Sequence, residues 1–179
     1  HEIDVRLGAT WIGREYVQEF MQELLDTPWR LRETIRVEFS SHASEWRITN
    51  KGRDSDSVSA SSTYGTKRMN AYEIIEATLN LPDVRVYARV PAPDGKDRPV
   101  LNGNETAAAQ IKQEEIRNAF KDWIFREPKR RDTLVEKYNR IFNQIRPREY
   151  NGSHLKFPGM NPEIRMNEHQ VNAIAHVLY

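Results

Sequence analysis

A run of basic residues between positions 126 and 148 is the stretch best suited to chemistry with a polyanion. It holds eight cations and only three acids. Clustered Lys and Arg side chains can neutralise phosphates and release counterions, which gives salt-dependent binding without sequence preference. The alternative is a solvated helix face of the same composition. The candidate DNA contacts in this run are Arg126, Lys129, Arg130, Arg131, Arg146 and Arg148.

A second candidate is the segment Tyr64–Arg68, which lies between a polar stretch and an expected helix. Backbone N–H groups at a helix start, the Thr66 hydroxyl and two cations together could hold one phosphate. Ser/Thr-rich segments before helices are also common as simple caps, so this alternative stays open. Lys67 and Arg68 therefore join the candidate DNA contacts.

The sequence contains no complete catalytic motif. Gly95-Lys96 is followed by Asp97, whereas a phosphate-binding loop needs Ser or Thr there. Asn161-Pro162 is followed by Glu163, whereas an amino-methyltransferase of DNA needs an Asn/Asp-Pro-Pro-aromatic turn. Neither a nucleophile elbow nor zinc-ligand spacing is present, and the histidines are scattered. We expect no catalysis, no bound metal and no cofactor in this chain alone.

Composition limits the protein class further. The chain has 179 residues, a net charge of +1 and no cysteine, which excludes disulfide scaffolds and thiolate metal sites. Hydrophobic content of 38% and charged content of 30% fit a polar but folded domain. No apolar run approaches the roughly 20 residues that span a bilayer, so we expect no membrane partner and a cytoplasmic location.

Hydrophobic spacing predicts the elements of the N-terminal half. Apolar positions recur at helical spacing from Gly13 to Leu25, and Thr34–Phe39 and Glu45–Thr49 alternate like an antiparallel hairpin. Residues 50–63 are small, polar and free of apolar periodicity. They read as a mobile loop or a disordered insertion.

The remaining pattern predicts mostly helix. Thr66–Leu81 reads as a helix and Val84–Val90 as a half-buried strand, with residues 99–101 pairing back on it. The chain is helical from Asn104, with a break at Glu127-Pro128 that suggests a helical hairpin. These elements predict an α+β fold with one small antiparallel sheet of three to five strands, helices on one face and a helical C-terminal half.

Four segments resemble very large bacterial polypeptides of phages and mobile elements, which look like fusions of an adenine-specific DNA methylase with a superfamily-two, Swi/Snf-like helicase. The resemblance implies a segment of a larger protein, lying between the methylase half and the helicase ATPase core. ATP with Mg²⁺ and S-adenosylmethionine are then cofactors expected of the parent protein. The segments are Val5–Ile12, Tyr64–Leu81, Asn102–Phe125 and Tyr138–Pro162.

The closing stretch, Phe157–Tyr179, resembles the adenine-reading Q motif of such helicases. It carries His169-Gln170 before a short apolar helix pattern. In that motif the glutamine amide forms one donor and one acceptor hydrogen bond with the adenine edge. The resemblance thus implies nucleotide-binding roles for His169 and Gln170, and a surface glutamine is the alternative. We divide the chain into an accessory domain, residues 1–147, and a loop with a Q-motif-like helix, residues 148–179.

These observations lead to two expectations for function. The first is a non-catalytic accessory segment that contacts the DNA backbone and supplies the adenine-reading lead-in to the ATPase. The second is a structural spacer that docks the methylase and helicase halves through protein contacts. Convergence of the basic residues on one concave face favours the first, whereas scattered cations and an exposed apolar patch favour the second.

Overall fold

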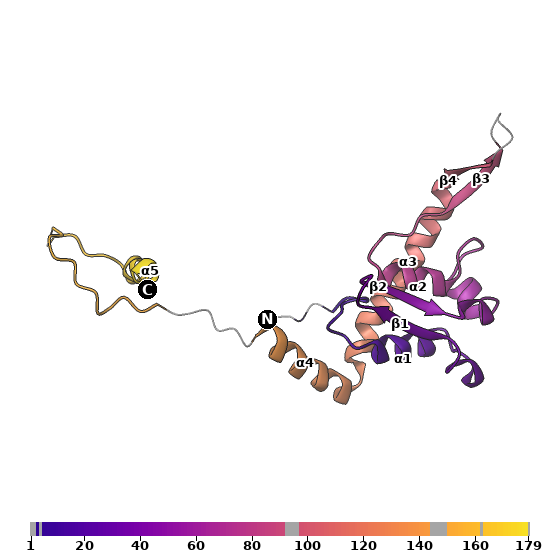
Figure 1. Cartoon of the computed structure of the whole chain (residues 1–179), viewed down its shortest axis with the longest axis horizontal. Coiled ribbons are helices and arrows are strands. Elements are labelled where there is room, and N and C mark those ends of the chain that lie inside the picture. The colour runs from indigo at the N-terminus through magenta and orange to yellow at the C-terminus, as the bar shows by residue number, and fades with distance from the viewer. Residues whose placement is uncertain (1–2, 4, 92–96, 144–149, 162, 179) are drawn as a thin grey trace. The chain divides into compact units, whose positions relative to one another are not determined.

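The computed structural model describes residues 3, 5–91, 97–143, 150–161 and 163–178, in two compact units, residues 1–138 and 139–179 (Figure 1). The fold is α+β with a helical C-terminal half, as the sequence predicted. Its helices and strands are α1 (Arg14–Leu24), β1 (Arg36–Ser40), β2 (Glu45–Thr49), α2 (Ala71–Leu79), β3 (Tyr87–Pro91), β4 (Asp97–Leu101), α3 (Gly103–Arg126), α4 (Pro128–Phe142) and α5 (Glu168–Leu178).

The described strands form two separate two-stranded sheets, not the one sheet of three to five strands that we expected. β1 and β2 form the predicted antiparallel hairpin, and its register places Val37 opposite Ile48 and Phe39 opposite Trp46. β3 pairs with β4, and Tyr87 lies opposite Leu101.

The core of the first unit lies between α1, α2, α3 and the β1–β2 sheet. The buried stripe of α1 includes Val17, Phe20 and Met21, as its spacing predicted. Phe20 contacts Phe120 of α3 edge to face, with ring centroids 5.0 Å apart. Such pairs add about 0.5–1.5 kcal/mol beyond the burial of their area. Trp46 is also buried, so the alternation of β2 places its apolar side chains in this core.

Amide and carboxylate side chains close both edges of the β1–β2 sheet. Gln18 of α1 donates from Nε2 to the Ile35 carbonyl at 2.8 Å and accepts from the Val37 N–H at 2.6 Å. Asn80 follows α2. It accepts from the Trp46 N–H at 2.7 Å and donates to the Trp46 carbonyl at 2.8 Å. Each side-chain amide thus supplies the donor and acceptor that a neighbouring strand would supply.

Side chains of α3 hold the segment that leads into β3 in the same way. The Val84 N–H donates to Gln113 Oε1 at 3.1 Å, and Gln110 Nε2 donates to the Val84 carbonyl at 3.3 Å. Two residues later the Val86 N–H donates to Thr106 Oγ1 at 3.0 Å. The backbone polar groups of residues 84 and 86 therefore point toward α3. These hydrogen bonds attach the base of the second hairpin to α3.

Residues 50–63 contain helical turns and two buried residues, whereas the sequence predicted a mobile loop or a disordered insertion without such structure. The segment contains a 3₁₀ turn at Lys51–Arg53 and a π-helical turn at Ser59–Thr63. Asp54 and Ala60 are buried within it. The backbone of Gly65 approaches the Ala60 carbonyl so closely that any Cβ there would collide with it. Contacts made by polar groups and backbone therefore order a segment that has no apolar pattern.

Helix boundaries differ from the sequence prediction in two places and agree in a third. The expected helix over residues 66–81 begins only at Ala71, because Asn70 and Glu73 form a capping box at its start. The N-cap of α3 is Asn102, two residues before the predicted Asn104. α4 begins at Pro128 as predicted, but it turns away from the end of α3 and forms no helical hairpin with it (Figure 1).

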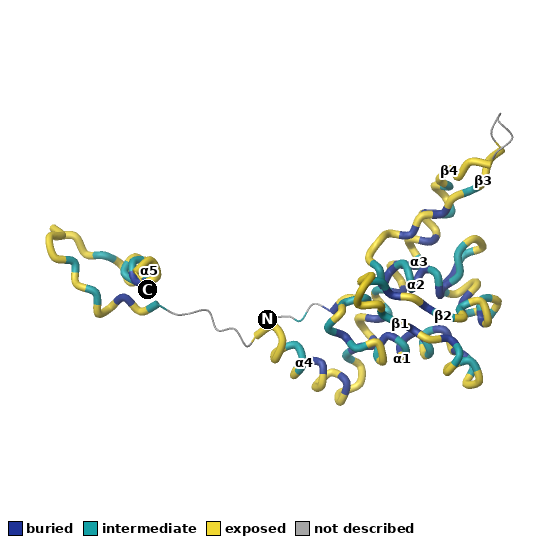
Figure 2. Tube along the Cα trace, viewed as in Figure 1, coloured by how far each residue is buried: buried dark blue, intermediate teal, exposed yellow. Residues whose placement is uncertain are grey.

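The β3–β4 hairpin projects from the body of the first unit and is largely exposed (Figure 2). Every described residue in its strands is exposed except Ala88, which is half-buried. The predicted half-buried strand over residues 84–90 is therefore buried only at its beginning, at Val84 and Val86. Four large apolar side chains on the hairpin are 45–51% exposed, namely Tyr87, Val90, Val100 and Leu101.

We expect Asn80→Ala to lower the free energy of unfolding by about 2–3 kcal/mol. The change removes both hydrogen bonds with Trp46 and leaves its partly buried backbone groups unpaired. Urea denaturation followed by circular dichroism measures the loss. Asn118→Ala, on the exposed surface of α3, is the matched control and should change stability by less than about 0.5 kcal/mol. Equal effects of the two substitutions would contradict a role for Asn80 as an edge cap.

Candidate functional site

The basic residues predicted to contact DNA do not form a common exposed surface. The guanidinium group of Arg130 is buried: its carbon lies 3.5 Å from the Trp123 ring centroid. Arg130 also donates to the carbonyls of Trp123 and Ile124 at 3.0 and 3.3 Å, and it pairs with Glu19 and Glu127. In the described structure Arg130 therefore holds the break between α3 and α4 and is not an exposed cation.

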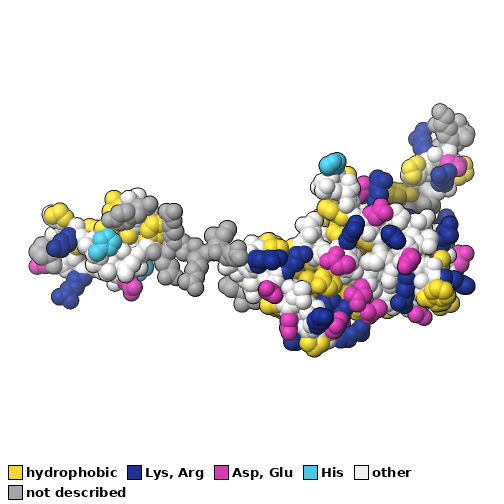
Figure 3. Space-filling model, turned by 60° about the horizontal axis from the view of Figure 1, so that its bottom comes forward, with side chains coloured by type: hydrophobic (Ala, Val, Ile, Leu, Met, Phe, Trp, Pro, Cys, Tyr) yellow, Lys and Arg dark blue, Asp and Glu magenta, His cyan; other side chains and the backbone are white. Residues whose placement is uncertain are grey.

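The other candidates have mixed surroundings. Arg126 pairs with Glu23 at 3.2 Å and Arg131 with Asp132 at 3.3 Å, and all four side chains are exposed. Lys129, Lys67 and Arg68 are exposed, and none of them pairs with an acid in the described ranges. Arg146 and Arg148 lie outside the described residues. In the view of Figure 3, basic and acidic side chains are interspersed over the first unit.

His169 and Gln170 lie in the first turn of α5, in the second unit, and both are exposed. Gln170 Oε1 accepts a hydrogen bond from the Asn167 N–H at 2.9 Å, and the Gln170 N–H donates to the Asn167 carbonyl at 3.0 Å. The side chain of Gln170 thus helps to cap its own helix. Its adenine-reading role stays a prediction from the resemblance.

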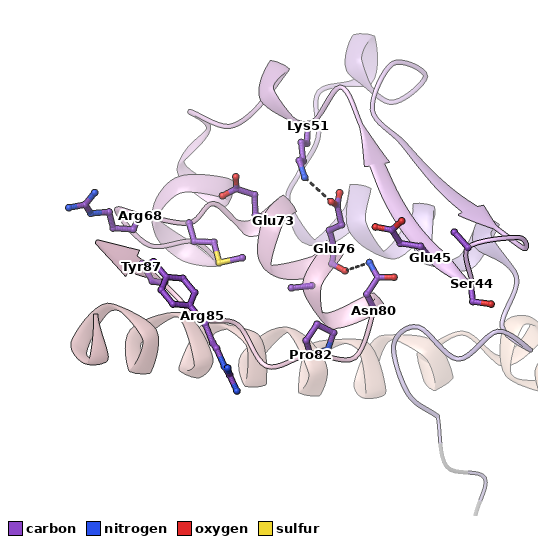
Figure 4. A pocket seen from close by; sticks show the side chains of 14 residues that line it. Ser44, Glu45, Lys51, Arg68, Glu73, Glu76, Asn80, Pro82, Arg85 and Tyr87 are labelled. Atoms are coloured by element: carbon purple, nitrogen blue, oxygen red, sulfur yellow. Dashed lines mark hydrogen bonds and ion pairs between the residues drawn. The ribbon is translucent and has the colours of Figure 1, made fainter. Parts of the chain in front are cut away.

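A groove of about 800 Å³ lies between α2 and the segment that leads into β3 (Figure 4). Met69, Ala77 and Asn80 line it on the α2 side, and Arg85 and Tyr87 line it on the other. Arg68 and Arg85 are exposed at its rim, while Lys51 turns toward Glu76 and pairs with it at 2.9 Å. Two exposed arginines therefore flank a groove whose lining also contains Glu45, Glu73 and Glu76.

The acids around this groove already have structural partners. Glu76 accepts from the Ile48 N–H at 2.8 Å as well as from Lys51. Glu73 accepts from the Asn70 N–H in the capping box, and Glu45 pairs with Arg47. No two of these carboxylates are arranged as an acid–base pair, because each one serves a backbone group or a cation. The arrangement suits binding and not acid–base chemistry.

Sequence reasoning did not single out Arg85 and Tyr87 as functional residues. It treated Arg85, Tyr87 and Arg89 as the polar face of a half-buried strand. The signal that could have found them is the alternation itself, because Arg85, Tyr87 and Arg89 share one face and all three are exposed. A strand with Arg and Tyr on one face and no apolar helix to cover it is an exposed strand.

A buried polar network joins the 50–63 segment to α2. The Tyr72 hydroxyl donates to Asp54 Oδ2 at 2.7 Å and lies 3.2 Å from Thr27 Oγ1. Burial raises the pKa of Tyr72 well above its usual range; the hydrogen bond with Thr27 opposes this increase, and the bond to Asp54 and its negative charge add to it. Since Tyr72 and Thr27 are almost completely buried, the network is a structural clamp.

Neither a metal site nor a membrane span is found in the described parts of the chain. No group of three or more His, Asp or Glu side chains is placed to hold a metal ion among residues that the structure describes. Within the same ranges, no helix is both long and apolar enough to cross a bilayer.

We expect Tyr72→Phe to cost about 1–3 kcal/mol of unfolding free energy at pH 7, because it removes the hydroxyl that bonds the buried Asp54. The pKa of Tyr72 in the folded state lies above the value of about 10 for a tyrosine in the unfolded chain. The stability that this hydroxyl contributes is therefore fully present below about pH 10 and is lost as the pH rises above 10. The difference between wild type and variant should therefore shrink above about pH 10. Urea titrations at several pH values test this, with Tyr87→Phe on the exposed hairpin as the neutral control.

We expect Arg130→Ala to destabilise the chain by about 2–3 kcal/mol, because two carbonyls and the Trp123 ring lose their partner. Arg131→Ala, one position away, removes only an exposed ion pair and should cost less than about 0.5 kcal/mol. Thermal or urea unfolding measures both. A neutral Arg130→Ala with reduced DNA affinity is the result that contradicts the structural role.

Comparison with known proteins gives a family but no activity. No curated protein and no solved structure matches the chain. A family model, described as a domain of unknown function (DUF8437), matches residues 6–144, which include α1 to α4 and the groove. The chain belongs to the DUF8437 family of domains.

Proposed function

We propose that this chain is a non-catalytic docking module that holds neighbouring protein parts through its β3–β4 hairpin. The observation that carries the proposal is the exposure of apolar side chains on both faces of that hairpin. Tyr87 and Leu101 are directly opposite each other on one face, and Val90 and Val100 lie on the other. Exposed apolar residues gathered on one projecting element are typical of protein interaction surfaces.

The stability of the hairpin supports the same proposal. A two-stranded hairpin on its own is marginally stable in water, and three or more strands or a packed helix are needed for independent stability. Among the described residues, the base of this hairpin has such support, from the hydrogen bonds of Val84 and Val86 with α3. Burial of four half-exposed apolar side chains against a partner would supply the missing stabilisation.

Contact with the DNA backbone is the competing function. Three of its eight expected cations, Lys67, Arg68 and Lys129, are exposed and have no acid partner in the described ranges. Arg126 and Arg131 are paired, and Arg130 is buried. A phosphate-binding surface needs several available cations on one side. The described geometry therefore favours docking over DNA contact.

The resemblance to methylase–helicase fusions supplies the setting for this proposal. In that setting the module sits in the cytoplasm between the two halves of a larger protein and binds neither ATP nor S-adenosylmethionine by itself. The methylase and helicase halves of the parent bind these cofactors. α5, with His169 and Gln170, leads into the ATPase and contributes to its adenine site.

Hydrogen exchange tests the docking role. We expect the amides of residues 87–91 and 97–101 to exchange at least tenfold more slowly in the full-length natural polypeptide than in the isolated 179-residue chain, because a docked hairpin opens less often. Amides of α2, inside the core, are the internal control and should not change. The double variant Val90→Asp/Val100→Asp should lose the added protection. Equal exchange of the hairpin in the two polypeptides would contradict docking.

A further inference from the structure

The structure points to a more specific mode of docking: we propose that residues 85–89, the outer edge of β3 and the two residues before it, bind an extended acidic segment of a partner protein by strand addition. This inference rests on the proposed docking function and names the surface and the kind of partner. The bound segment would lie in the groove between β3 and α2 and would pair its backbone with residues 85, 87 and 89.

The direction of the backbone groups follows from the pairing. The Asn102 N–H donates to the Val86 carbonyl at 2.9 Å, and Ala88 and Val90 continue the same register toward β4. In an antiparallel pair, residues alternate between those that bond to the neighbouring strand and those that point away from it. The N–H and C=O groups of Arg85, Tyr87 and Arg89 therefore point away from β4.

Those outward groups face an open space. Arg85, Val86 and Tyr87 form one wall of the groove, and the opposite wall comes from α2 and the residue before its cap, Met69. In the described structure no side chain is hydrogen-bonded to the backbone of Arg85, Tyr87 or Arg89. This differs from the β1–β2 sheet, where Gln18 and Asn80 occupy the corresponding groups on both edges.

The outer edge of β4 is protected, whereas that of β3 is not. Pro99 lies at an outward position of β4, opposite Arg89, and has no N–H to offer. Proline at such positions is a common way in which proteins prevent pairing at an exposed edge. β3 has no proline until Pro91, at its end. One edge of the hairpin is thus blocked and the other is left open.

Charge at the groove selects the chemistry of the partner. Arg68 and Arg85 are exposed at the rim, and neither pairs with an acid in the described ranges. Figure 4 shows both side chains extending away from the groove floor, whereas Lys51 turns inward to Glu76. A bound segment with acidic side chains at alternate positions would pair with these arginines. Charge pairs at a partly exposed rim mainly determine partner choice and association rate.

A row of alternating backbone donors and acceptors fits a polypeptide better than a nucleic acid. Strand pairing repeats every second residue, about 6.6–6.8 Å along the strand, and a peptide presents N–H and C=O groups at the same interval. Phosphates can accept hydrogen bonds but cannot donate to the outward carbonyls. A phosphate backbone therefore satisfies only half of the groups that β3 exposes.

The test begins with random ten-residue peptides displayed on phage and selected against the 179-residue chain. We expect enriched peptides with acidic residues at alternate positions. The best one, made synthetically, is then N-methylated at one backbone amide at a time. Methylation at alternate positions should weaken binding at least tenfold, and methylation at the positions between them should have little effect, because only every second amide faces β3. Weakening without this two-residue period would overturn strand addition.

Matched variants locate the peptide. Tyr87→Pro removes an outward N–H from β3, and Leu101→Pro makes the same change directly opposite on β4. We expect the first variant to lose at least tenfold in affinity for the selected peptide and the second to bind normally, with both checked for folding by circular dichroism. Arg68→Glu and Arg85→Glu should each weaken binding of the acidic peptide, and more so at low salt.

Other outcomes separate this inference from the docking function. Failure to select any peptide, or equal loss in Tyr87→Pro and Leu101→Pro, overturns strand addition. If the hairpin is nevertheless protected in the full-length polypeptide, docking through its apolar faces stands. Binding of single-stranded DNA in place of peptide, abolished by Arg68→Glu and insensitive to Tyr87→Pro, overturns the inference in favour of nucleic acid.

Discussion

The fold depends on satisfying backbone hydrogen-bonding groups that two-stranded sheets leave open. A buried N–H or C=O without a partner costs about 1–3 kcal/mol, and a two-stranded sheet has two such edges. Helices α1, α2 and α3 each contribute polar side chains that take the place of missing strands: Gln18 on β1, Asn80 and Glu76 on β2, and Gln113 at the start of the second hairpin. These bonds also fix how each helix is placed on its sheet, because an amide bridges only where its donor and acceptor both fit.

A similar use of polar groups explains the position of Arg130 within the basic run. The run from Arg126 to Arg148 looks like a phosphate-binding face because its residues are close in sequence. In the structure Arg130 instead lies against Trp123 and bonds to carbonyls at the end of α3, where α4 begins at Pro128 and can donate no N–H at its first residue. The guanidinium supplies donors to a helix end whose carbonyls are buried. One arginine of the run is therefore buried against Trp123, whereas Arg126 and Arg131 form exposed ion pairs.

Hydrophobic periodicity was sufficient to predict α1 and the β1–β2 hairpin, because apolar side chains determine both structures. The break between α3 and α4 was predicted from Pro128 itself. Hydrophobic periodicity failed where polar groups or backbone contacts determine the structure. Asp54 accepts a hydrogen bond from the buried Tyr72, and the Gly65 backbone lies close to the Ala60 carbonyl. Neither contact produces a periodic pattern of apolar residues in the sequence. Gln18 and Asn80 look like surface residues in a sequence, since their role appears only when a strand edge is placed beside them. The groove at β3 was missed for the same reason.

The fold protects some of its strand edges and leaves the outer edge of β3 unprotected, and this difference connects the fold with the proposed function. Where an edge lies beside the core, side chains close it, and where β4 faces outward, Pro99 interrupts it. An exposed edge with regular donors and acceptors invites aggregation, so proteins normally protect it. β3 has no such protection between residues 85 and 89, although the same chain protects its other edges by several different means. An open edge beside a groove, with arginines at the rim and apolar side chains on both faces, is stable in a cell when another polypeptide covers it.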